Sequence, residues 1–218
     1  MITEACLSRH SKNQVGVARE KQGRNACSTL LIVDAQSVKN TDTAKLKGYD
    51  GGKKVSGIKR HLAVDTQGLP HAVAVTTANV TDRKGMLQAL CRCKPELGRV
   101  QSLLADSGYA GKPFAQGVSE ILGKHVEVHI ARRSELHTFK VIPKRWVVER
   151  SFAWLEKNRR LWKNCERLLN KHQSAVHPLG LPEPAAQKTL NRLLAASSQS
   201  GSTTRSRIEV GTSHEPGV

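Results

Sequence analysis

Short apolar runs, separated by turn-forming residues and by segments with a helical period, recur along this sequence and limit the folds open to it. Residues 30–36 are the first such run; they are rich in branched side chains and too short for a helix. Residues 60–66 and 71–77 flank the turn sequence Gln67-Gly68-Leu69-Pro70, which is typical of a β-hairpin. Further strands are predicted at residues 100–105 and 126–131.

Helices are predicted between and after these runs. Residues 82–93 place two leucines one turn apart, and residues 113–122 begin with a proline and end before a glycine, as helices often do. Residues 144–162 form a third and longer apolar-periodic segment. The resulting order, strand-strand-strand-helix-strand-helix-strand-helix, predicts an α/β fold in which a mixed sheet is flanked by helices.

The length of 218 residues allows one substantial domain. We expect an irregular N-terminal arm at 1–29, a folded domain at 30–170 and a divergent tail at 171–218. Ser, Thr, Gly, Pro and Gln dominate from Ser197 onward, so most of this tail is expected to be disordered. A short helix at 185–196 is an alternative for part of it.

The charge balance of the chain is strongly basic. Lys and Arg number 35 and Asp and Glu number 18, which gives a formal net charge of +17. Such an excess favours a polyanionic partner, most often nucleic acid, although membrane surfaces and ribosomes also attract basic proteins. Aromatic residues make up only 4% of the chain, which argues against a single-strand-binding platform built on base stacking.

No apolar run suits a signal peptide or a membrane span, so the sequence predicts a cytoplasmic protein that has no membrane partner. The scattered cysteines accordingly read as reduced thiols.

Three acidic residues stand in specific local phrases. Asp34 ends the first apolar run, Asp106 ends a later one, and Glu149 lies in a helix-like stretch. Taken singly, each aspartate reads as a turn residue and Glu149 as a solvated partner of Arg145. Together they offer the hard oxygen ligands that Mg²⁺ prefers, and in so basic a chain a phosphodiester is the natural substrate of such metals.

The phrases around these acids carry a resemblance to a known family. They are Val33-Asp34-Ala35-Gln36-Ser37-Val38-Lys39, Gly48-Tyr49-Asp50-Gly51-Gly52-Lys53-Lys54-Val55 with Lys59-Arg60-His61, Ala105-Asp106-Ser107-Gly108-Tyr109-Ala110-Gly111, and Arg145-Trp146-Val147-Val148-Glu149-Arg150-Ser151-Phe152. Over residues 30–169 the chain closely resembles bacterial insertion-sequence transposases of the DDE class, within the insertion-sequence 4/5-type superfamily. The resemblance implies a ribonuclease H-like fold.

The resemblance also implies a chemistry. Asp34, Asp106 and Glu149 would be the catalytic carboxylates and would hold two Mg²⁺ ions, with Mn²⁺ as a substitute. The implied activity is metal-dependent phosphodiester hydrolysis and strand transfer at insertion-sequence ends. The implied partners are transposon-end and target DNA, a homo-oligomer assembled on that DNA, and the bacterial nucleoid. The implied DNA contacts are Lys53, Lys54, Lys59, Arg60, Arg145, Arg150 and Lys157.

Departures from the family pattern leave alternatives open. The helix-turn-helix region that relatives carry before the first catalytic strand is missing here, and the chain diverges after Cys165-Glu166-Arg167-Leu168, as a shifted reading frame near residue 171 would cause. A catalytically inactive DNA-binding remnant and a stand-alone nuclease are therefore alternative hypotheses. The role of Lys157 is also open, since Glu156 occupies the position seven residues after Glu149.

Overall fold

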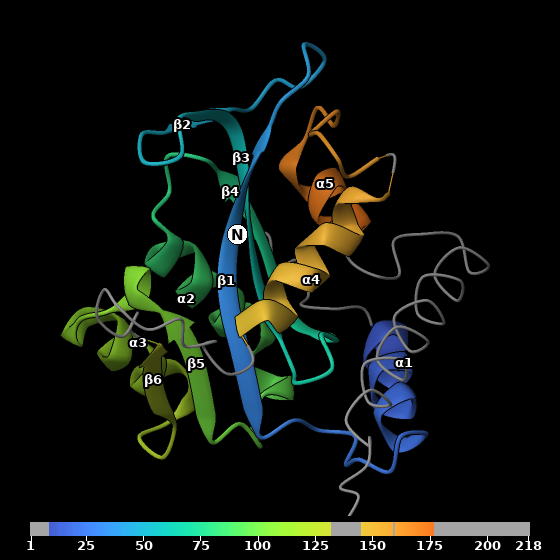
Figure 1. Cartoon of the computed structure of the whole chain (residues 1–218), viewed down its shortest axis with the longest axis vertical. Coiled ribbons are helices and arrows are strands. Elements are labelled where there is room, and N and C mark those ends of the chain that lie inside the picture. Colours follow the sequence, from blue (N-terminus) through green and yellow to red (C-terminus); the bar gives the residue numbers. More distant parts are fainter. Residues whose placement is uncertain (1–8, 132–144, 159, 177–218) are drawn as a thin grey trace, which may run out of the picture.

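The computed structural model describes residues 9–131, 145–158 and 160–176, which form a six-stranded mixed sheet with helices on both faces (Figure 1). The strands are β1 (Leu30–Lys39), β2 (Gly48–Asp50), β3 (Val55–Val64), β4 (Pro70–Thr77), β5 (Ser102–Asp106) and β6 (Glu127–Ala131). The helices are α1 (Arg9–Glu20), α2 (Asp82–Cys93), α3 (Lys112–Leu122), α4 (Arg145–Glu156) and α5 (Leu169–Val176), with short 3₁₀ turns η1 (Lys94–Glu96) and η2 (Ser107–Tyr109).

The sheet has an antiparallel half and a parallel half. β3 lies between β1 and β4 and is antiparallel to both, and the short β2 pairs with its beginning. On the other side of β1, β5 and β6 follow in parallel. This arrangement confirms the predicted α/β, ribonuclease H-like mixed sheet flanked by helices, including the β3–β4 hairpin and the strand-helix alternation that follows it.

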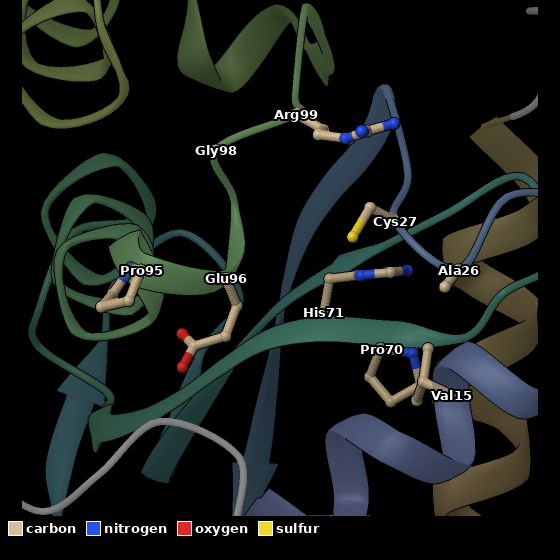
Figure 2. Close-up of a pocket in the computed structure, with 9 residues that line it drawn as sticks. All are labelled: Val15, Ala26, Cys27, Pro70, His71, Pro95, Glu96, Gly98 and Arg99. Atoms are coloured by element: carbon tan, nitrogen blue, oxygen red, sulfur yellow. The ribbon is translucent and has the colours of Figure 1, made fainter.

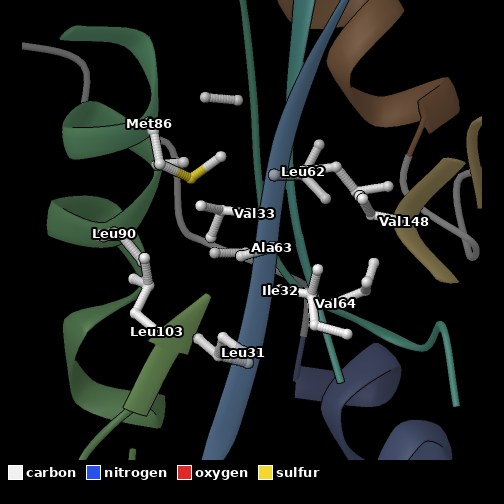
Figure 3. Packing of buried hydrophobic residues seen from close by; sticks show 14 of the residues in the cluster. Leu31, Ile32, Val33, Leu62, Ala63, Val64, Met86, Leu90, Leu103 and Val148 are labelled. Carbon is white, nitrogen blue, oxygen red and sulfur yellow. The ribbon is translucent and has the colours of Figure 1, made fainter. Parts of the chain in front are cut away.

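β1 runs through the centre of the core and separates two apolar layers (Figure 3). Leu31 and Val33 point toward α2, where they meet Met86, whereas Ile32 points to the opposite side, toward Val148 of α4. Side chains along a strand alternate between its faces. Asp34 follows Ile32 by two positions and therefore belongs to the face that α4 covers.

Local sequence signals account for the helix boundaries. The Thr81 hydroxyl accepts a hydrogen bond from the backbone N–H of Lys84 at 3.3 Å, which caps α2 as a threonine typically does. α3 has a proline in its first turn and ends at Gly123, whose φ of 113° suits a residue without a side chain. These boundaries agree with the predicted ones to within about a residue.

The N-terminal region differs from the prediction, because α1 forms within the arm expected to be irregular. Val15 and Ala18 pack on Leu69 in the turn between β3 and β4. Arg19 forms an ion pair with Asp65, whose side chain has no exposed surface. Most residues of α1 are polar and its apolar face is narrow, so the sequence shows no clear helical period there. The residues that α1 contacts lie far away in the sequence, and a local pattern could not predict them.

The C-terminal region also differs. α4 ends at Glu156 rather than near residue 162, since a turn follows in which the N–H of Leu161 bonds to the carbonyl of Asn158 at 2.8 Å. α5 packs against β4 and buries His172, so the packed chain reaches at least residue 176 and passes the expected boundary at 170. The predicted helix at 185–196 and the tail from Ser197 lie outside the described residues.

Two further sequence expectations meet the structure here. Cys27, Cys91 and Cys165 are free thiols, whereas Cys93 is disulfide-bonded, so the expectation of reduced thiols is wrong for Cys93. Among the described helices, none combines the length and the apolar character that crossing a membrane requires.

Candidate active site

Two of the three predicted carboxylates lie just beyond the point where the parallel pairing of β1 and β5 ends. This pairing runs from Leu30 opposite Ser102 to Ile32 opposite Leu104, and Asp34 and Asp106 each follow the last pair by two residues. Equal spacing from the same pair places both side chains on the same face, with Asp34 in the middle of β1 and Asp106 at the carboxyl end of β5. Both are half-buried. The structure therefore brings Asp34 and Asp106 to one edge of the sheet.

A buried tyrosine connects this edge electrostatically to a third aspartate. Tyr109, in η2 directly after β5, is 1% exposed, and its ring packs on Phe114 with centroids 5.1 Å apart. Burial raises the pKa of Tyr109 well above its usual value, and the negative charges of Asp34, Asp82 and Asp106 raise it further. These three aspartates therefore share one neighbourhood, and Asp82, at the start of α2, is a member that the sequence did not reveal.

Glu149, the third predicted carboxylate, lies on a different element. It lies on α4, whose neighbouring residues Val147 and Val148 are buried against the sheet, and its own side chain is exposed. Within the described ranges, no group of three or more His, Cys, Asp or Glu side chains is arranged to hold a metal ion. The structure thus brings Asp34 and Asp106 together and places Glu149 on the helix that covers their face.

Lys59, one of the predicted DNA contacts, is buried instead. Its ammonium group lies 2.8 Å from Asp82 Oδ1 and 3.1 Å from Asp50 Oδ2, and it donates to the carbonyl of Val80 at 3.0 Å. Burial alone would lower the pKa of Lys59, but the hydrogen bonds and charges of Asp82 and Asp50 outweigh it and raise the pKa. Only 5% of the residue is exposed, so we correct its assignment from a phosphate contact to an internal ion pair.

Arg60 is also reassigned, since it has no exposed surface. Its Nε donates to His172 Nε2 at 3.0 Å, and its terminal nitrogens donate to the carbonyl of Leu161 and to Gln36 Oε1. Burial lowers the pKa of Arg60 to about 10, and the negative charge of Glu156 partly offsets that effect. Arg60 therefore joins the sheet to α5 and to the segment after α4, and DNA could reach it only if this packing opened.

Arg150 has a similar structural role. Its guanidinium stacks on the rings of Trp146 and Trp154, 4.6 Å and 5.0 Å from their centroids, and donates to the carbonyl of Gln67 at 2.9 Å. This contact fixes α4 on the β3–β4 turn. Trp146 is exposed, and it covers one face of Arg150 rather than an apolar layer.

The remaining predicted DNA contacts are accessible or not described. Lys53 and Lys54 are exposed in the turn between β2 and β3, and Lys157 is exposed directly after α4. The side chain of Arg145 lies outside the described residues. The accessible predicted contacts are thus Lys53, Lys54 and Lys157.

A separate pocket lies at the opposite edge of the sheet, where β1 and β4 begin (Figure 2). Its wall includes Cys27, His71, Glu96 and Arg99. His71 also lies 3.3 Å from the buried carboxylate of Asp65 and so helps to fix the β3–β4 turn. Asp34 and Asp106 lie further along β1 and β5, just beyond the point where the parallel pairing of these strands ends, so this pocket is not part of the carboxylate edge.

Comparison with known proteins identifies the family. The family model described as "Transposase DDE domain" matches residues 25–177, more than half of the chain, and spans Asp34, Asp106 and α4. The chain belongs to the DDE transposase domain family.

Individual relatives of this transposase domain are more distant. A Burkholderia cepacia protein named "Putative transposase for insertion sequence element IS402" is 32% identical over 123 residues, which are 53% of this chain and 57% of that protein. The chain therefore spans little more than half the length of this curated relative.

Solved structures with some likeness to this transposase domain include a chain of the simian T-cell lymphotropic virus intasome in complex with PP2A regulatory subunit B56 gamma. Its TM-score is 0.41, with 18% identity over 75% of this chain and 47% of that one. The Mos1 Strand Transfer Complex matches with a TM-score of 0.34 and 13% identity over 92% and 62% of the two chains. The Mos1 mariner paired end complex with Mn matches with a TM-score of 0.31 and 12% identity, over 90% of this chain and 64% of that one.

The side chains of the transposase domain suit the metals that its family uses. Asp34, Asp106 and Glu149 supply carboxylate oxygens, which are the donors that hard divalent cations such as Mg²⁺ prefer. Asp82 adds a fourth carboxylate nearby, at the first position of α2. The only sequence signal for Asp82 was an acid in the first turn of a predicted helix, a position that acids favour for reasons unrelated to catalysis.

Proposed function

We propose that the chain is the catalytic portion of an insertion-sequence transposase of the 4/5 type, which cuts and joins DNA strands at the ends of its element. The observation that carries this proposal is the placement of Asp34 and Asp106 at matching positions on adjacent parallel strands, on the face covered by the helix of Glu149. The family match supports the same conclusion.

In this proposal Asp34, Asp106 and Glu149 hold two Mg²⁺ ions, for which Mn²⁺ can substitute. Bound metals of this kind activate the attacking oxygen and stabilise the leaving oxygen of an in-line displacement at phosphorus. The protein side chains hold and orient the metals and the DNA. Asp106 is itself oriented by the N–H of Gly108, which donates to its Oδ1 at 2.9 Å.

The proposed partners are the transposon ends and the target DNA. Exposed lysines near the carboxylate edge, chiefly Lys53 and Lys54, would contact phosphates, and Lys157 would add a contact beyond α4. We further propose that the protein acts as a homo-oligomer on DNA, in the bacterial cytoplasm and on the nucleoid when bound.

The experiment is Mg²⁺-dependent nicking of a supercoiled plasmid that carries the terminal inverted repeats flanking the gene. Asp34→Asn and Asp106→Asn should each reduce the nicking rate at least about 100-fold, the usual effect of removing a main source of transition-state stabilisation. Glu127→Gln removes an exposed carboxylate on β6 and serves as the matched control.

The outcomes separate the alternatives. A chain that binds the plasmid but nicks it with neither Mg²⁺ nor Mn²⁺ is a DNA-binding remnant, not an enzyme. Nicking that does not depend on the inverted repeats would instead identify a stand-alone nuclease.

A further inference from the structure

Lys59 is the centre of a group of ion pairs that joins separate parts of the chain. Its ammonium group contacts Asp82 at the start of α2 and Asp50 at the end of β2, and only 6% of its side chain is exposed. The Asp50 side chain is 11% exposed and that of Asp82 is 28% exposed. Burial strengthens such contacts, since little water is present to screen them. Lys59 thus fixes β2 relative to the start of α2.

The carboxylate that Lys59 holds also shapes the turn between β2 and β3. Asp50 Oδ1 accepts hydrogen bonds from the backbone N–H groups of Gly52 and Lys53, both at 3.1 Å. Asp50 Oδ2 accepts from the Ser37 hydroxyl at 2.6 Å. The two oxygens of Asp50 accept from different donors, so a shift of this carboxylate would also shift the backbone of the turn.

Lys53 extends from this turn to the carboxylate edge. Its ammonium group donates to the carbonyl oxygen of Ala35, the residue after Asp34, at 2.8 Å and lies 3.8 Å from Asp82 Oδ2. Its side chain is nevertheless 45% exposed. Lys53 is therefore held next to a predicted catalytic residue while part of it remains accessible from solution.

We propose that Lys59 is a positioning residue that, through Asp50 and Asp82, holds Lys53 beside Asp34, where Lys53 contacts the DNA phosphate at which the strand is cut. This inference rests on the proposed function and deepens it. A lysine ammonium is a compact charge that suits phosphate oxygens, and a phosphate is a stronger partner than the neutral carbonyl of Ala35. When DNA binds, the ammonium group of Lys53 would exchange the carbonyl of Ala35 for the phosphate with little movement of the turn.

The first test measures the nicking rate at saturating DNA and the Kd for the same DNA. Lys53→Gln should lower the rate at least about tenfold and change Kd by less than about threefold, because a contact at the cut phosphate stabilises the transition state more than the ground state. Lys47→Gln removes the same charge from an exposed position just before β2 and should leave the rate unchanged. A Lys53→Gln variant that nicks at the parent rate would overturn the proposal.

The second test is a double-mutant cycle with Lys59→Met. If Lys59 acts through Lys53, each single variant should lose a similar share of the rate, and the double variant should be no slower than the worse single. Losses that multiply would show that Lys59 acts independently of Lys53 and would refute the positioning role. Asp50→Asn replaces Lys59→Met in the cycle if the latter does not fold, since it removes one partner of Lys59 that is not among the carboxylates near Tyr109.

A third measurement does not need an active enzyme. Backbone amide hydrogen exchange at Gly52 and Lys53, the two donors to Asp50, should become at least about tenfold faster in Lys59→Met or Asp82→Asn, with exchange in α3 unchanged. Unchanged exchange at these two amides would exclude the positioning role even if the parent chain never nicks DNA. Failure of the parent to nick, with faster exchange in the variants, would instead refute the proposed function alone.

Discussion

Arg60 Nε donates a hydrogen bond to His172 Nε2 at 3.0 Å, inside the protein, and so connects the middle of the sheet with α5. The bond requires a neutral imidazole, because only an unprotonated nitrogen can accept from a guanidinium. Burial lowers the pKa of His172 to about 3, and the positive charges of Arg60 and Arg160 act in the same direction. His61, on the other face of β3, has a pKa lowered to about 4, chiefly by burial.

These histidines should make the fold sensitive to acid. In the unfolded chain each titrates near its ordinary value of 6.5, so between about pH 6.5 and pH 4 the unfolded state binds more protons than the folded state. The contribution of these two histidines to the free energy of unfolding is therefore fully present above pH 6.5. It is lost as the pH falls, by about 1.4 kcal/mol per pH unit for each histidine. Urea unfolding across this pH range measures the slope.

A variant assigns part of that slope to His172. In His172→Gln the side-chain oxygen still accepts from Arg60 but does not titrate, so the slope should fall by about 1.4 kcal/mol per pH unit. His129→Gln, at a histidine with a 54% exposed side chain, is the control and should leave the slope unchanged. Equal slopes in the parent and in His172→Gln would show that His172 does not titrate on unfolding as expected.

Glu149→Gln should abolish metal-dependent strand cleavage while leaving DNA binding intact. The amide retains the shape of the side chain but loses the charge that holds a divalent ion, whereas DNA binding depends on lysines elsewhere. Nicking and filter binding of the same DNA report the two properties separately. Cleavage at the parent rate would remove Glu149 from the metal site and make Glu156 the candidate, although its Oε1 already accepts from Gln36 at 2.7 Å.

DNA binding should weaken steeply with salt. Each phosphate contact contributes about −0.9 to the slope of log K against log salt concentration, so removing one exposed lysine should make the slope less steep by about 0.9. Lys54→Gln and Lys157→Gln are expected to show this change, and Lys112→Gln, at the start of α3, is the comparison. A parent slope near zero would mean that the net charge of +17 serves another purpose.

Gly85→Ala should destabilise the fold, although alanine is the better helix former. A Cβ at position 85 of α2 would lie 2.0 Å from Nε2 of His61, which is fully buried and cannot move aside. Overpacking of this kind costs about 1–3 kcal/mol, which exceeds the gain of up to about 1 kcal/mol from helix propensity. Gly98→Ala, where no atom lies within 4 Å of the added Cβ, should be nearly neutral in thermal or urea unfolding.

Five of the six strands and the first two predicted helices were accessible from the sequence because their signals are local, whereas β2 and the first half of β3 were not predicted. Apolar runs, a hairpin turn around Gly68 and a capping threonine before α2 each depend on neighbouring residues. α1 and α5 were missed because long-range contacts hold them: Arg19 with Asp65, and His172 with Arg60. Such pairs are separated by tens of residues and leave no periodic pattern.

The candidate site likewise has one part that could be predicted from the sequence and one part that could not. Asp34 and Asp106 could be placed side by side, since both follow apolar runs that pair as parallel strands, although β1 continues beyond Asp34 to Lys39. The basic residues could not be sorted by sequence, because Lys53 and Lys59 occur in the same basic stretch although one is half exposed and the other is buried. Burial depends on which element covers the strand, and only the folded chain determines that. Whether Asp34, Asp106 and Glu149 hold metals together stays a prediction.

The ion pair between Arg19 and Asp65 bears on how the domain can be produced. The family match begins at residue 25, which invites an expression boundary there. Asp65 has no exposed surface, and its carboxylate also organises the hairpin turn by accepting from the N–H groups of Gln67 and Leu69 at 2.8 Å and 3.0 Å. Without α1, this anion would lose its guanidinium partner and the cover over Leu69. We therefore expect a fragment that begins at residue 25 to be less stable than one that retains α1, although α1 lies outside the segment by which the family is recognised.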